Sequence, residues 1–207
     1  MDNTNERLGD ILKINYKIKT LTYNICKYVI RILIFINVIN NFIKKDYYFT
    51  LIGVAAFILT FIPSLIFKIM KIEPDKSLYL SIIIFIFISL YLGTLNNFYR
   101  YTWWDTMLHT ISGIIIGFFA IIILRKHSPN KSIDNYNKIF IFIFILSFAA
   151  LCGVVWEIYE FTIDTLFNLD MQGVEYTGVT DTMVDLIADL IGSIISYVIY
   201  HFTYKKQ

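Results

Sequence analysis

The stretch Leu78–Leu95 reads LYLSIIIFIFISLYLGTL and contains no charged residue. A helix of about 20 apolar residues crosses the hydrocarbon core of a bilayer, which is about 30 Å thick. A second uncharged apolar stretch, Tyr48–Phe67, precedes it in the chain. The composition agrees, because 57% of the 207 residues are hydrophobic. The lipid bilayer is therefore the expected surrounding of this chain.

Four more apolar segments complete a predicted all-α integral membrane bundle of six transmembrane helices. The expected spans are residues 25–43, 48–67, 78–95, 103–124, 139–163 and 181–202. Residues 1–24 are polar and carry several lysines, which predicts a cytoplasmic lead-in to the first span. Residues 25–207 are expected to form a single six-helix transmembrane domain.

The basic residues predict the orientation of the bundle, since cytoplasmic loops of membrane proteins carry an excess of Lys and Arg. Of the 18 Lys and Arg residues, 14 fall on the side that holds both termini. Lys44, Lys45 and Arg100 fall on the other side, and Arg31 lies within the first span. The pattern predicts a multi-pass protein of the bacterial cytoplasmic (inner) membrane with both termini in the cytoplasm. The net charge of +2 then reflects topology, and no nucleic-acid partner is expected.

Acidic residues in the last three expected spans are the unusual feature of the sequence. These spans contain no Lys or Arg, but they contain Asp105, His109, Glu157, Glu160, Asp181, Asp185 and Asp189. An ionised carboxylate in hydrocarbon costs roughly 2.5 to 3.5 kcal/mol, so this group needs a cation, protons, water or mutual pairing. By the predicted orientation they share one depth, and we expect a polar site at the outer, extracytoplasmic end of helices four to six.

Helical spacing places the acids of each span on one face. Asp105 lies four residues before His109, and Asp181, Asp185 and Asp189 repeat at the same interval. These faces continue inward as small residues: Gly113, Gly117, Gly153 and Gly192. Small residues let helices approach each other closely in lipid. Spans four, five and six are therefore expected to pack together.

Three interpretations of the acidic site remain open. In the first, all seven residues are candidate ligands of a divalent metal ion. Glu157 and Asp185 are then the candidate catalytic residues of a hydrolase or transferase for a lipid-linked or envelope substrate. In the second, the carboxylates carry protons or cations in a transporter. In the third, they only hydrogen-bond the helices together in a structural or accessory protein.

Four single features carry further expectations. Pro63 predicts a kink in span two, and Arg31 is expected to extend to the cytoplasmic interface. Ser112 has no nearby base except His109, so a serine nucleophile is disfavoured. The segment 164–180 is either a solvated acidic loop or a lid over the site.

Three sequence blocks resemble the YjdF-like family of bacterial multipass inner-membrane proteins. The first block, YRYTWWDTMLHTISG at residues 99–113, resembles a segment WWDxxLHxxSG of that family. The second and third are WEIYE at residues 156–160 and DTMVDLIADLIG at residues 181–192. The resemblance covers residues 45 to 200 and implies the helix count and the choice of site residues, but no reaction. The acidic helix in mid-chain and the Asp-bearing final helix are also similar in architecture to VanZ-like proteins.

Overall fold

The computed structural model describes residues 2–72, 75–133 and 136–204. Lys205 and Lys206, which contribute to the charge asymmetry, lie outside these residues. Within them, six helices are long and apolar enough to cross a membrane: Thr20–Ile43, Tyr47–Ile69, Lys76–Thr94, Trp104–His127, Lys138–Phe167 and Thr180–Thr203. The prediction of an all-α chain with six spans is therefore confirmed. The chain divides into two compact units, Met1–Asn97 and Phe98–Gln207, which are described separately below.

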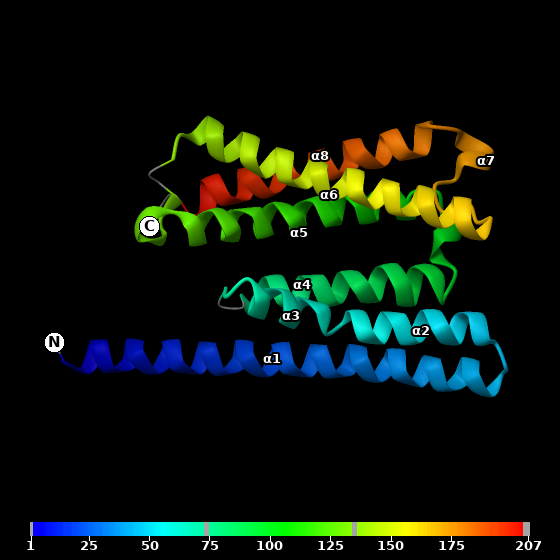
Figure 1. Ribbon diagram of the computed structural model, residues 1–207. Coiled ribbons are helices and arrows are strands. Elements are labelled where there is room, and N and C mark those ends of the chain that lie inside the picture. The colour runs from blue at the N-terminus through cyan, green and yellow to red at the C-terminus, as the bar shows by residue number, and fades with distance from the viewer. Residues whose placement is uncertain (1, 73–74, 134–135, 205–207) are drawn as a thin grey trace. The chain divides into compact units, whose positions relative to one another are not determined.

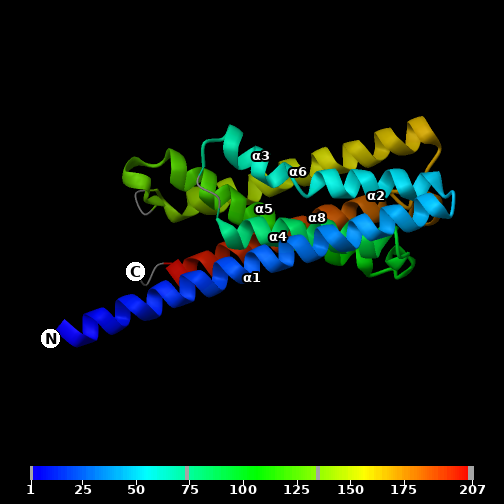
Figure 2. The same cartoon turned by 90° about the horizontal axis from the view of Figure 1, so that it is seen from below.

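The first unit begins with α1 (Asp2–Ile43), a single uninterrupted helix. It contains both the expected lead-in and the first span, so no break in the helix separates them. In Figures 1 and 2 the first turns of α1 extend beyond the ends of the other helices of this unit. Helix α1 packs against α2 (Tyr47–Leu59) and α4 (Lys76–Ile86).

The second span is broken between α2 and α3 (Ile62–Ile69), as Pro63 predicts. A break in a helix leaves backbone carbonyls without their usual N–H donors. The side chain of Arg31 supplies a donor to one of these carbonyls. Its Nη2 donates to the carbonyl of Thr60 at 3.0 Å and its Nε to the Thr60 hydroxyl at 3.0 Å. The guanidinium carbon lies 3.8 Å from the centre of the Phe61 ring. Arg31 was expected to extend to the cytoplasmic interface, but its guanidinium binds Thr60 at the break in the second span.

The third span changes its helical pitch. It begins as α4, capped by the Asp75 carboxylate, which accepts a hydrogen bond from the backbone N–H of Leu78 at 2.8 Å. It continues as π-helical turns, η1 (Phe87–Thr94). Ser64 of α3 and Tyr79 of α4 share a hydrogen bond of 2.6 Å. We find no physical reason in the sequence for the π-helical turns.

The second unit contains the three acidic spans. It consists of η2 (Phe98–Arg100), α5 (Trp104–His127), η3 (Pro129–Lys131), α6 (Lys138–Phe167), α7 (Val174–Thr177) and α8 (Thr180–Tyr204). Figure 1 shows α5, α6 and α8 running side by side along their lengths. At one end of the unit a buried cluster that includes Ile121, Ile133 and Ile145 forms an apolar core. The acids lie towards the other end.

The backbones of α5 and α8 touch at a seam of glycines. A Cβ atom on Gly113 would overlap the backbone carbonyl of Asp189, and one on Gly192 would overlap the carbonyl of Thr110. Gly117 similarly faces the side chain of Ser196. This close approach fixes the side chains of α8 at a constant distance from those of α5, which positions the acidic site.

Candidate functional site

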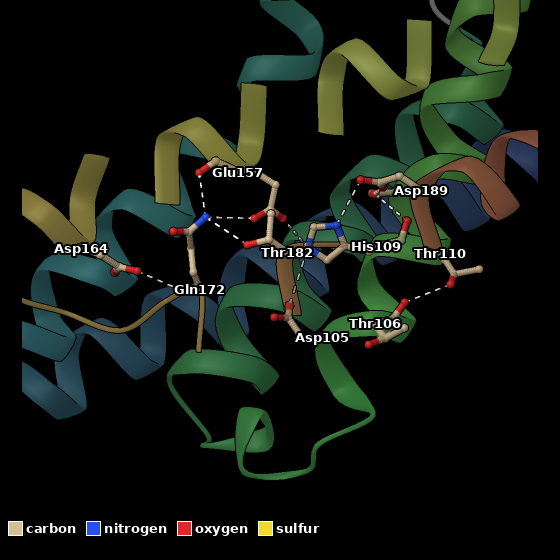
Figure 3. A network of polar contacts seen from close by, with 10 residues as sticks. Asp105, Thr106, His109, Thr110, Glu157, Asp164, Gln172, Thr182 and Asp189 are labelled. Carbon is tan, nitrogen blue, oxygen red and sulfur yellow. Dashed lines mark hydrogen bonds and ion pairs between the residues drawn. The ribbon is translucent and has the colours of Figure 1, made fainter. Parts of the chain in front are cut away.

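His109 lies at the centre of the acidic cluster, with 6% of its surface exposed. Its Nε2 atom is 4.0 Å from Oδ1 of Asp105, one helical turn earlier in α5, and 4.0 Å from Oε1 of Glu157 in α6. Its other ring nitrogen, Nδ1, is 3.1 Å from Oδ2 of Asp189 in α8. Figure 3 shows the imidazole between Asp105 and Asp189, with Glu157 beside it. Residues from all three helices therefore meet at one imidazole.

Asp185 completes a group that has the geometry of a metal site. Asp105, His109 and Asp185 each offer one ligand atom, and these three atoms lie within 4.8 Å of one another. Ligands about 2.0–2.6 Å from a common ion lie roughly 3–5 Å apart, depending on the angle between them. A small inward movement of the side chains would bring all three into contact with one cation.

Two carboxylate oxygens in this cluster have no hydrogen-bond partner among the described residues. They are Oε1 of Glu157 and Oδ1 of Asp185, and both atoms are inaccessible to solvent. Three ion pairs join His109 to acids of the cluster, so one imidazole faces Asp105, Glu157 and Asp189 among the described residues. Burying an unpaired carboxylate oxygen costs several kcal/mol. The cluster is therefore short of positive charge or of hydrogen-bond donors.

Asp189 is the most deeply buried of the acids, at 1% exposure. While Oδ2 faces His109, Oδ1 accepts a hydrogen bond from the Ser112 hydroxyl at 2.5 Å. The hydroxyl oxygen of Ser112 also lies 2.8 Å from the backbone carbonyl of His109, so its one O–H proton is shared between the two acceptors. The Ser112 hydroxyl thus lies between a carboxylate and a carbonyl.

Gln172 connects the segment between α6 and α8 to the cluster. Its Nε2 lies 3.2 Å from Oε2 of Glu157, 3.3 Å from the Glu157 carbonyl and 3.3 Å from the hydroxyl of Thr182, so two N–H groups are shared among three acceptors. The carboxylate of Asp164 accepts from the backbone N–H groups of Met171 and Gln172 at 2.8 and 3.0 Å. The segment is therefore folded onto the site at Gln172, whose amide Figure 3 shows directed toward Glu157 and Thr182.

The remaining two candidates lie at the edge of the cluster. Glu160 is buried on α6, and Asp181 is half-buried at the start of α8, where its Oδ2 packs close to Gly173. Neither forms an ion pair with His109 among the described residues. The structure thus gathers Asp105, His109, Glu157, Asp185 and Asp189 around one point and places Glu160 and Asp181 beside them.

The sequence interpretation missed two polar partners. Ser112 lies one turn after His109, so helical spacing could have suggested that it shares a partner with the histidine. Gln172 comes from an irregular segment, and no periodic signal points to it. Each of them binds one carboxylate oxygen of the cluster: Ser112 binds Oδ1 of Asp189, and Gln172 binds Oε2 of Glu157.

Comparison with known proteins identifies the family. Residues 25–206 match a family described as "Predicted membrane protein (DUF2238)". A Thermotoga maritima protein named "Uncharacterized protein" is 34% identical over 104 residues, which cover 49% of this chain. The chain spans 50% of the length of that curated relative. No solved structure matches the chain. The match does not carry the name YjdF-like, and the similarity to VanZ-like proteins is not supported. The chain belongs to this family of predicted membrane proteins, DUF2238.

Proposed function

We propose that this protein binds a divalent cation through Asp105, His109 and Asp185 and uses it for hydrolysis or group transfer on a lipid-linked substrate. The observation that supports binding most directly is the pair of buried, unpartnered carboxylate oxygens on Glu157 and Asp185. A cation would neutralise both, whereas neither has a hydrogen-bond partner among the described residues. Oxygen ligands with one imidazole suit Mg²⁺, Mn²⁺, Ca²⁺, Zn²⁺ or Fe²⁺.

The arrangement gives each residue a separate role in this proposal. Asp105, His109 and Asp185 are the ligands, because their donor atoms lie closest together. A bound cation supplies a polarised water or substrate oxygen. Glu157 is then the general base, since Gln172 holds its Oε2 while its Oε1 stays free, 4.0 Å from His109 Nε2.

The position of the site within the membrane spans indicates the class of substrate. The site lies in the ends of three spans that are long and apolar enough to cross a bilayer. The asymmetry of Lys and Arg supports an extracytoplasmic position for that end, with both termini in the cytoplasm of a bacterial inner membrane. A substrate that reaches this depth from the bilayer has a lipid part, and its reactive group sits near the interface.

The metal content of the purified protein tests the proposal. Protein loaded with each metal in turn and then desalted should retain about one equivalent of the preferred ion, and His109→Ala and Asp185→Asn should retain much less. Glu175→Gln is the matched control, because Glu175 is an exposed acid outside the cluster. If the wild type retains no metal, the metal-dependent enzyme is excluded, and a proton-carrying or purely structural role for the acids takes its place.

A further inference from the structure

We infer that Asp189 is a positioning residue for His109 and not a metal ligand, and that with Ser112 it fixes which ring nitrogen of His109 faces the cation. The inference rests on the proposed function, since it assigns the orientation of a ligand at that site. It changes the role of Asp189, which the sequence placed among the candidate ligands.

Both carboxylate oxygens of Asp189 are already occupied. Oδ2 lies 3.1 Å from Nδ1 of His109, and Oδ1 accepts from Ser112. The buried carboxylate oxygens without a hydrogen-bond partner belong to Glu157 and Asp185 and not to Asp189. Asp189 could bind a cation only by giving up one of these two hydrogen bonds.

The surrounding helices hold the carboxylate in this position. A Cβ atom on Gly153 of α6 would lie 2.5 Å from Oδ2 of Asp189, so only a glycine leaves room for the carboxylate there. On the α5 side, Gly113 packs directly against the Asp189 backbone. Gly113 therefore holds the backbone of Asp189, and Gly153 leaves room for its carboxylate against α6.

The consequence for His109 follows from the chemistry of imidazole. A neutral imidazole carries one N–H, and a carboxylate can only accept a hydrogen bond. Asp189 therefore holds the proton on Nδ1 and leaves the lone pair on Nε2. The Nε2 atom is the one that lies 4.0 Å from Asp105 and from Glu157. Metal-binding histidines commonly donate their other N–H to a carboxylate in this way, and loss of that partner costs 10–100-fold in metal affinity.

Nitrogen NMR of the ring reports this orientation directly. The chain has three histidines, and the spectrum of His109→Ala assigns the His109 signals in protein labelled with ¹⁵N-histidine. With ¹¹³Cd²⁺ as the probe, we expect cadmium–nitrogen coupling at Nε2 and a retained proton on Nδ1. Coupling at Nδ1 would overturn the inference.

Variants separate the positioning role from a structural one. In Asp189→Ala the Nδ1 proton should no longer be fixed, and Cd²⁺ affinity should fall 10–100-fold. Ser112→Ala should produce a smaller loss of the same kind. The matched control is Glu175→Ala, an exposed acid outside the cluster, which should leave the ring signals unchanged. A lower melting temperature in Asp189→Ala with unchanged affinity and unchanged ring signals would show that Asp189 is only structural.

The same spectra remain decisive if the wild type binds no cation. In that case the proposed function fails, but the tautomer can still be read from the metal-free protein at a pH where the imidazole is neutral. Protonation at Nδ1 in the wild type, lost in Asp189→Ala, supports the positioning role. Protonation at Nε2 in the wild type refutes it.

Discussion

Replacing Gly153 by alanine tests how tightly the site is constrained. The new Cβ atom would lie 2.5 Å from Oδ2 of Asp189, 3.3 Å from its Cγ and 3.3 Å from Cδ2 of Leu186. Optimal contacts between nonbonded heavy atoms are about 3.5–4.0 Å, so the carboxylate or the helix must move by about 1 Å. A movement of that size away from α6 would change the 3.1 Å hydrogen bond to His109.

Two opposing effects determine how much Gly153→Ala changes the stability of the protein. Overpacking of a closely packed site costs typically about 1–3 kcal/mol, whereas alanine is favoured over glycine within a helix by about 1 kcal/mol. The net loss of stability should therefore be about 0–2 kcal/mol. The loss of metal affinity should be larger, about 10–100-fold, since the orienting contact to His109 is disturbed directly.

The assay compares cation affinity with thermal unfolding in the same detergent. Affinity can be measured by competition with a fluorescent chelator, using the metal that the wild type retains. Gly53→Ala is the matched control, because its Cβ atom would lie 2.8 Å from Cγ2 of Val38 in the first unit. We expect it to change stability by a similar amount without changing affinity. Wild-type affinity in Gly153→Ala, or an equal loss in both variants, would refute the reasoning.

Three further predictions concern other parts of the chain. In Arg31→Leu the carbonyl at the helix break loses its donor, which costs about 1–3 kcal/mol; an unchanged unfolding midpoint would show that Arg31 is not needed there. In Gln172→Ala, hydrogen exchange of residues 168–179 should rise, whereas equal exchange would mean that other contacts hold the segment. In a cysteine-free background, an impermeant maleimide added to intact cells should label Lys45→Cys and not Asn130→Cys. The reverse pattern would place the site on the cytoplasmic side.

The sequence predicted the spans well, because long apolar runs depend on local composition. The third expected span, Leu78–Leu95, differs from the observed Lys76–Thr94 by one or two residues at each end. Helical spacing also predicted which acids share a face. It could not predict which atoms meet, since the partners of Arg31 and Ser112 are 29 and 77 residues away in the chain. Such contacts depend on how the helices are rotated against one another.

The glycine seam between α5 and α8 also restricts how the second unit can move. Carbonyl groups of Thr110 and Asp189 stand where side chains would otherwise be, one on each side of the seam. Sliding or twisting either helix would push backbone atoms into each other. Transport by alternating access relies on one group of helices rocking against another. In this unit α5 and α8 would travel together as one rigid pair, so any opening has to occur at α6 or in the segment that carries Gln172.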